Sequence, residues 1–167
     1  RMATRVEQVR FDDGRATGVH GQSNAGEPFD VHARIVVDAS GRTTLIGSQF
    51  GLKGPVPGLT MASVWSYYRG GQRLCGIDGG ETTVFMIADR GWFWYIPLPD
   101  DIVSVGVVAD PDYLFTETAE FEPVFEREVA RCLPLMARLK GTTRVAPVRG
   151  LRRLAYRNRQ VAGDGRE

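Results

Sequence analysis

The chain has 167 residues, of which 43% are hydrophobic and 25% are charged, and its formal net charge is +1. This composition predicts a globular domain with a core of its own, and the low net charge argues against a surface built to bind nucleic acid or a membrane. No apolar run approaches the length of a membrane span. The two cysteines, Cys75 and Cys132, lack metal-ligand spacing, so we expect free thiols in the reducing cytoplasm and no metal site.

A small antiparallel meander is expected at the start of the chain. Residues 3–11 and 16–21 read as a hairpin, because Asp12-Asp13-Gly14-Arg15 between them has the composition of a turn. Phe29 and Val31 indicate a third short strand.

The segment 33–42 contains a β-branched apolar run that ends in Asp38-Ala39-Ser40-Gly41, and a helix is expected to start at Thr43 or Thr44. An unbroken apolar strand is typical of a parallel sheet, so we expect burial on both of its faces. Small residues at its carboxyl end allow a ligand to approach closely, and open α/β sheets bind ligands at that edge.

The middle of the chain predicts an antiparallel sheet, because four short strand-like segments follow one another and tight turns separate the last three. The expected strands are 61–69, 82–88, 92–98 and 102–109. A helix begins near Glu122, with Phe121, Phe125 and Val129 recurring at helical spacing. Pro134 interrupts this helix, and the tail over 143–160 is expected to be extended.

The third of these strands carries two of the chain's three tryptophans. Side chains two residues apart point to the same face of a strand, so Trp92, Trp94 and Ile96 share one face. Phe93 and Tyr95 occupy the other. Large aromatic residues on both faces indicate either a buried core strand or the wall of a cavity.

Several of these segments resemble parts of one family. The motif formed by Trp92, Trp94 and Ile96-Pro97 resembles the W-x-W-x-I-P signature of flavin-dependent halogenases. The segment 35–42 resembles the second flavin motif of the glutathione-reductase-type FAD fold, and 155–165 looks like the segment before that fold's last FAD strand.

The resemblance implies a mixed α+β and α/β fold, part of a glutathione-reductase-type FAD-binding fold with an antiparallel substrate-domain sheet. It places residues 1–50 in the FAD-binding domain and 51–142 in the substrate domain. Residues 143–167 would return toward the FAD-binding domain. The chain does not open as a complete protein would, so we expect an internal fragment.

The resemblance also implies chemistry. Such an enzyme uses reduced FAD, supplied by a separate flavin reductase, together with O₂ and chloride or bromide. Hypohalous acid then halogenates an electron-rich phenol or pyrrole, often held on a carrier protein. The implied barrier between flavin and substrate consists of Trp92, Trp94, Ile96 and Pro97. The implied FAD-binding residues are Asp38, Ala39, Ser40 and Gly41, although the segment could equally be an ordinary strand-to-helix turn with Ser40 or Thr43 as the N-cap.

Two parts of the family pattern are missing from the chain. The G-x-G-x-x-G loop and the catalytic lysine would both lie upstream of Arg1, and neither Lys53 nor Lys140 fits the lysine motif. We therefore expect the chain alone to be inactive. Asp164-Gly165 reads as a hairpin turn rather than as the family's later Gly-Asp flavin motif, because mostly polar residues precede it.

Two other functions remain open from the sequence. An FAD-dependent monooxygenase, or a reductase of the geranylgeranyl-reductase type, would share the fold and the strand that ends at Gly41. A non-enzymatic β-rich module could use Trp92 and Trp94 to bind an aromatic ligand.

Overall fold

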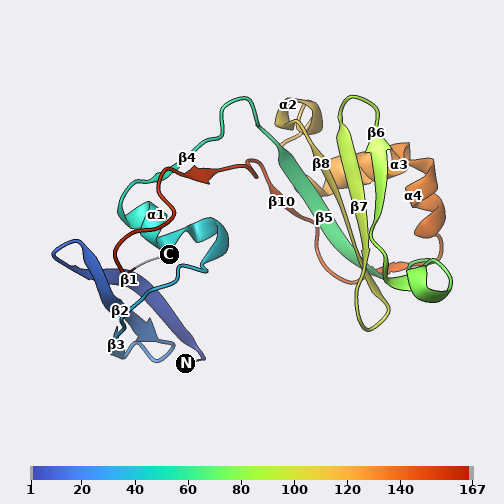
Figure 1. Cartoon of the computed structure of the whole chain (residues 1–167). Coiled ribbons are helices and arrows are strands. Elements are labelled where there is room, and N and C mark those ends of the chain that lie inside the picture. Colours follow the sequence, from blue (N-terminus) through green and yellow to red (C-terminus); the bar gives the residue numbers. More distant parts are fainter. Residues whose placement is uncertain (1, 166–167) are drawn as a thin grey trace. The chain divides into compact units, whose positions relative to one another are not determined.

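The computed structural model describes residues 2–165, which form two compact units (Figure 1). Unit 1 combines both ends of the sequence, residues 2–56 and 156–165, whereas unit 2 is the continuous segment 57–155. No helix in the described part of the chain is both long and apolar enough to cross a membrane.

A three-stranded antiparallel meander opens unit 1, as the sequence predicts. Strand β1 (Thr4–Asp12) pairs with β2 (Arg15–Ser23), and β2 pairs with β3 (Pro28–His32). Val9 and Ala16 from this meander are buried against Val36 and Ile46 and form a small core.

The segment 33–42 does not form the doubly buried strand that the sequence predicts. Val36 is buried, but Ile35 and Val37 are 63% and 66% exposed. The Val36 N–H donates to the carbonyl of Gly165 at 2.8 Å, and residue 36 forms only an isolated bridge. A strand buried on both faces needs neighbours on both of its edges. The sheets of residues 2–165 supply no parallel neighbour, so the prediction of a parallel strand is wrong for this chain.

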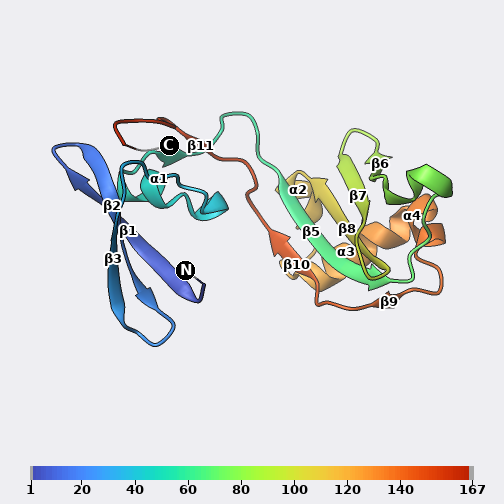
Figure 2. The ribbon, with the colours of Figure 1, turned by 60° about the horizontal axis from the view of Figure 1, so that its bottom comes forward.

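Two short helical turns and a two-stranded pairing complete unit 1. A 3₁₀ turn (Gly41–Thr43) leads into helix α1 (Leu45–Gln49), one residue after the predicted start. Strand β4 (Lys53–Gly54) then pairs antiparallel with β11 (Arg157–Asn158), which ties the two ends of the sequence together (Figure 2).

An antiparallel six-stranded sheet is the frame of unit 2. Its order is β10-β5-β8-β7-β6, and β9 pairs with the far end of β5 (Figure 2). The strands are β5 (Ala62–Arg69), β6 (Thr83–Ile87), β7 (Gly91–Pro97), β8 (Ile102–Ala109), β9 (Thr143–Arg144) and β10 (Arg149–Leu151). The four long strands lie within one residue of their predicted ends.

The β7–β8 connection is a tight turn with Asp100 and Asp101 at φ 60° and 57°. Two successive residues with positive φ are typical of a type I′ turn, whose twist matches that of antiparallel strands. The turn sets the register that places residues of β7 opposite residues of β8, including Trp94 opposite Gly106.

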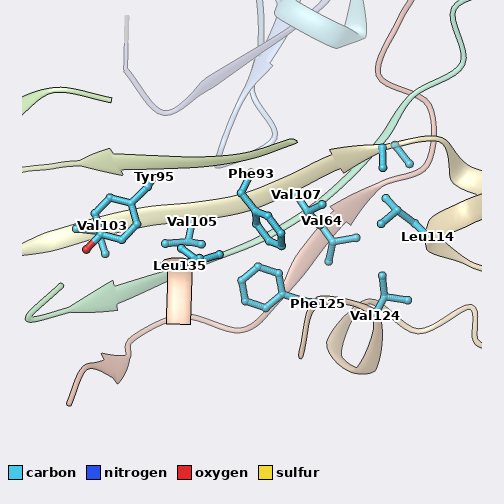
Figure 3. Packing of buried hydrophobic residues seen from close by; sticks show 12 residues of the cluster. Val64, Phe93, Tyr95, Val103, Val105, Val107, Leu114, Val124, Phe125 and Leu135 are labelled. Carbon is cyan, nitrogen blue, oxygen red and sulfur yellow. The ribbon is translucent and has the colours of Figure 1, made fainter. Parts of the chain in front are cut away.

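Three helices cover one face of this sheet: α2 (Pro111–Leu114), α3 (Phe121–Arg131) and α4 (Leu133–Arg138) (Figure 1). The predicted interruption at Pro134 is confirmed, since α3 ends at Arg131 and α4 begins at Leu133. Figure 3 shows Phe93 of the sheet near Phe125 of α3, within the main hydrophobic core.

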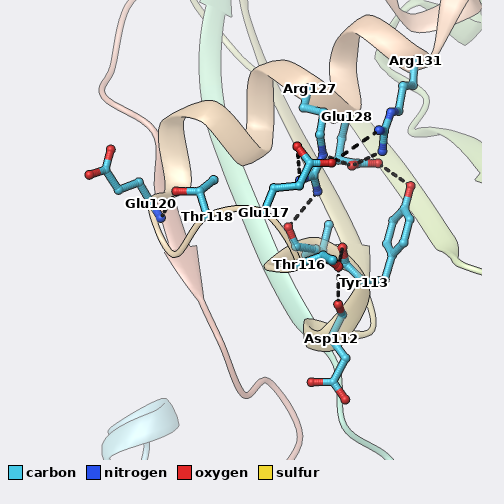
Figure 4. Close-up of polar contacts among 10 residues, drawn as sticks. Asp112, Tyr113, Thr116, Glu117, Thr118, Glu120, Arg127, Glu128 and Arg131 are labelled. Carbon is cyan, nitrogen blue, oxygen red and sulfur yellow. Dashed lines mark hydrogen bonds and ion pairs between the residues drawn. The ribbon is translucent and has the colours of Figure 1, made fainter.

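A buried carboxylate joins the helices. Glu128 of α3 is 1% exposed. Its oxygens accept hydrogen bonds from the Tyr113 hydroxyl at 2.7 Å, Arg127 Nε at 2.8 Å and Arg131 Nη1 at 3.3 Å (Figure 4). Burial and the hydrogen bond to Glu128 raise the pKa of the Tyr113 hydroxyl. The hydroxyl therefore keeps its proton at neutral pH and remains a hydrogen-bond donor to Glu128.

The tail predicted as residues 143–167 divides between the two units. Strands β9 and β10 pair with β5 in unit 2, whereas residues from Tyr156 onward belong to unit 1. The boundaries between the compact units lie at residues 56/57 and 155/156. The division into functional domains over 1–50, 51–142 and 143–167 stays a prediction.

Candidate active site

Strand β7 presents two different faces. Phe93 and Tyr95 are fully buried under the helices, and the Tyr95 hydroxyl donates to the Gln72 carbonyl at 3.0 Å. Burial raises the pKa of this hydroxyl. By the alternation of the strand, Trp92 and Trp94 lie on the opposite face, and Trp92 is 37% exposed. The core interpretation of the strand therefore holds for one face, and the other face is open within unit 2.

Trp94 lies in a row of residues across three neighbouring strands. In the sheet register it stands opposite Gly106 of β8, which in turn stands opposite Trp65 of β5. The rings of Trp65 and Trp94 are 6.4 Å apart with an interplanar angle of 42°. The indole N–H of Trp94 donates to Ser104 Oγ at 3.1 Å.

Trp65, Ser104 and Gly106 are not among the site residues expected from the sequence. A signal was present only for Ser104 and Gly106 and only through the register, because the tight turn at 99–101 fixes which residues of the strands before and after it face each other. Ile96 stands opposite Ser104, and Pro97 ends the strand opposite Val103. Both are half-buried.

The loop from Asp38 to Gly41 is organised by the Asp38 carboxylate. Its Oδ1 accepts from the Ser40 N–H at 3.0 Å and from the Ser40 hydroxyl at 2.5 Å, and its Oδ2 accepts from the Ile46 N–H at 2.8 Å. Partial burial opposes ionisation, but these hydrogen bonds outweigh it and hold the pKa of Asp38 below its ordinary value. The carboxylate is thus occupied in shaping the loop.

Ser40 is occupied in the same way. Its hydroxyl oxygen accepts from the Leu45 N–H at 2.9 Å, at the start of α1. Ser40 is nevertheless not the N-cap of α1, because that position is occupied by Thr44, and Ser40 precedes the 3₁₀ turn without a side-chain capping bond. The other two residues of the loop, Ala39 and Gly41, have no polar side chain.

A cavity of about 380 Å³ adjoins this loop within unit 1. Its walls come from both ends of the sequence: Asp38, Ala39, Gly41, Thr44, Ile46, Gly47, Leu52, Tyr156, Asn158, Gln160, Val161 and Ala162. The Tyr156 hydroxyl donates to the Gly41 carbonyl at 3.0 Å. Among the described residues, the buried Oδ1 of Asn158 has no hydrogen-bond partner. An unsatisfied buried acceptor beside a cavity is what a polar ligand would complete.

Neither of the two lysines belongs to the strand that carries Trp92 and Trp94. Lys53 Nζ, in β4, donates to the Arg42 carbonyl and lies 4.7 Å from the centre of the Tyr156 ring. Lys140 follows α4. Residues 2–165 contain no cluster of side chains suited to a metal ion.

Asp164 and Gly165 form a turn, as predicted. Asp164 accepts from Arg15 Nη1 at 2.6 Å through its side chain and from the Ala16 N–H at 3.0 Å through its carbonyl. The second strand of a hairpin would fall on Arg166 and Glu167, outside the described residues.

The fold is that of the FAD-dependent halogenases. The chain superimposes with a TM-score of 0.84 on CndH, the myxobacterial chondrochloren halogenase, described as a variant of FAD-dependent halogenases. The two chains are 28% identical, and the match covers 98% of this chain and 38% of the other.

Sequence comparison gives the same relatives. The chain is 30% identical over 167 residues to the tryptophan 2-halogenase of Chondromyces crocatus, a match to 96% of this chain and 31% of the relative. It is 27% identical over 140 residues to the 1H-pyrrole-2-carbonyl-(peptidyl-carrier protein) chlorinase of Pseudomonas fluorescens. This match covers 81% of this chain and 31% of the relative. No family model matches. The predicted resemblance is confirmed: the chain is related to flavin-dependent halogenases and spans about a third of the curated relatives it matches.

Proposed function

We propose that this chain supplies a flavin-side loop and the substrate-domain sheet of an FADH₂-dependent halogenase that acts on an electron-rich aromatic ring. The observation that carries the proposal is the W-x-W-x-I-P strand, which presents its indoles on the open face of a halogenase-type sheet. The preferred substrate is a phenol or a pyrrole, with a carrier-protein thioester as one form, because one relative is named for such a substrate.

The cofactor would supply the oxidant. Reduced FAD, O₂, a halide ion and a proton give FAD, water and hypohalous acid. The ring carbon then takes the halogen from hypohalous acid and loses its proton, and water leaves. The role proposed for the chain is to position and separate the reactants.

The cavity beside Ala39 and Gly41 is where the proposal places part of the flavin nucleotide. Its volume of about 380 Å³ suits one portion of such a ligand. The unsatisfied Oδ1 of Asn158 offers an acceptor to a ligand donor. In this proposal Ala39 and Gly41 contact the cofactor, and Asp38 and Ser40 shape the loop.

Trp92, Trp94, Ile96 and Pro97 would form the barrier between the flavin and the substrate. Two rigid indoles fill a large volume, so they can keep the aromatic ring away from the flavin while a small oxidant passes. No proton transfer is assigned to these side chains.

A flavin reductase would deliver the reduced cofactor in the cytoplasm, a location that suits the free thiols of Cys75 and Cys132.

The test uses the full-length protein that carries this sequence, with reduced FAD, O₂ and resorcinol or a pyrrole-2-carbonyl carrier-protein thioester. We expect a mass-spectrometric product with the isotope pattern of chlorine or bromine, formed only when the halide is present. Hydroxylation that does not depend on halide would instead support the monooxygenase alternative and overturn the proposal.

The barrier role has its own test. Replacing both Trp92 and Trp94 by alanine should raise the fraction of hydroxylated product, because the ring then reaches the flavin. Circular dichroism must show that the double variant remains folded. A folded variant that halogenates without hydroxylated product would contradict the barrier.

A further inference from the structure

The Trp94 indole is held at its polar end by one hydrogen bond. An indole has a single donor and no acceptor, so the bond from Nε1 to Ser104 Oγ at 3.1 Å fixes the direction in which the ring points. Ser104 is 8% exposed, so few water molecules compete for its hydroxyl oxygen. The bond is diagonal, since Ser104 stands opposite Ile96 in the register.

The other end of the Trp94 ring lies over Gly106. A Cβ atom added to Gly106 would come within 2.2 Å of Cζ2 and 2.4 Å of Cη2 of Trp94, and within 2.6 Å of the Cβ of Trp65. These distances are far below van der Waals contact. The ring therefore occupies space that exists only because residue 106 has no side chain.

Trp92 has no comparable support. It stands opposite Val108 on one side and Met86 on the other, and Met86 is 75% exposed. Trp92 itself is 37% exposed, and in residues 2–165 its indole N–H has no hydrogen-bond partner. The two indoles of the motif thus differ in how firmly the sheet holds them.

We propose that Ser104 and Gly106 of β8 are positioning residues for Trp94. They fix its indole in one orientation across the open face of the sheet, with Trp65 limiting its movement on the far side. The consequence for chemistry rests on the proposed function: Trp94 would be the fixed part of the barrier, and Trp92 would be the part that can move.

The geometry is tested first on the 167-residue chain itself. With ¹⁵N-labelled indoles, nuclear magnetic resonance resolves the three Nε1–H groups, and replacement of each tryptophan by phenylalanine assigns them. We expect Ser104→Ala to speed hydrogen exchange of the Trp94 indole about tenfold, the effect of losing one hydrogen bond. The Trp65 and Trp92 indoles should keep their rates, and Ser104→Thr should restore the slow exchange.

Ser63→Ala is the matched control, because Ser63 is also a buried serine in a neighbouring strand of the sheet. It should leave all three exchange rates unchanged. Among the three Nε1–H resonances, Gly106→Ala should shift that of Trp94 most. Because the added methyl group can also prevent folding, the test of the proposal rests on comparing Ser104→Ala with Ser104→Thr. If Ser104→Ala alters no rate, or alters all three equally, the positioning role is overturned.

The consequence for chemistry is tested separately in the full-length protein. Ser104→Ala should raise the ratio of hydroxylated to halogenated product, whereas Ser104→Thr and Ser63→Ala should keep the ratio of the parent. A change in Trp94 exchange without a change in product ratio would support the positioning role and count against the barrier. Failure of the positioning role can therefore be distinguished from failure of the barrier role.

Discussion

At the scale of single residues, mutation of Gly41 can distinguish an effect on cofactor binding from an effect on the backbone conformation of the loop. Gly41 has a φ of 62° and lines the cavity of unit 1, and a Cβ added there would meet no atom within 4 Å. Gly51 has nearly the same conformation, with φ 61°, and equally open surroundings, but it does not line the cavity. The two glycines form a matched pair for mutation.

We expect Gly41→Ala and Gly51→Ala to destabilise unit 1 by the same amount, about 1 kcal/mol each, because an alanine at positive φ is strained equally at both positions. Only Gly41→Ala should weaken FAD binding in the full-length protein, since only Gly41 lines the cavity. Titration of FAD, followed by flavin fluorescence, measures the affinity. Equal losses of affinity in both variants would indicate that the cavity is not where FAD binds.

At the scale of elements, α3 depends on the buried Glu128. The carboxylate is surrounded by two guanidinium groups and a hydroxyl, and Arg127 Nη2 also donates to the Leu114 carbonyl at 2.7 Å, which links α3 to α2. A buried charge that loses its partner is costly, because it has left water and gains nothing in return. The network should therefore matter more than any exposed ion pair of the same helix.

Glu128→Gln should destabilise unit 2 by about 2–4 kcal/mol, because it leaves the buried part of Arg127 without its counter-charge. Glu120→Gln removes the same charge from an exposed position next to α3, and its effect should stay within about 0.5 kcal/mol. Urea unfolding followed by tryptophan fluorescence compares the two. Similar midpoints for both variants would show that the network contributes little.

Sequence reasoning succeeded where local signals decide the structure. The four long strands of unit 2 end within one residue of their predicted positions, because each is a short strand-like segment and tight turns separate the last three. It failed for 33–42, because an apolar pattern becomes a buried strand only when partners flank it. The support of Trp94 was missed for another reason: Ser104 and Gly106 carry no signal until the register places them beside the indole.

At the scale of the whole molecule, the two units differ greatly in their cores. Four buried residues make up the core of unit 1: Val9, Ala16, Val36 and Ile46. The core of unit 2 joins a sheet to three helices and contains Phe93, Tyr95 and Phe125. All three tryptophans of the chain, Trp65, Trp92 and Trp94, fall in unit 2.

We therefore expect unit 1 to unfold at a lower urea concentration than unit 2. Far-ultraviolet circular dichroism should show both transitions, whereas tryptophan fluorescence should show only the second. A chain shortened to residues 57–155 should retain the fluorescence transition. Coincident transitions by both probes in the 167-residue chain would mean that the units unfold as one.

The pairing of β4 with β11 has a consequence for the order of folding. Arg159 reaches the Gly51 carbonyl across 108 positions of sequence, so forming this contact in an open chain means closing a long loop. Within unit 2 the Leu154 N–H donates to the Met61 carbonyl at 2.8 Å, which brings the two connecting segments together. Once unit 2 has folded, most of the loop is already closed. Nucleation should therefore begin in the sheet of unit 2, and the two halves of unit 1 should join last.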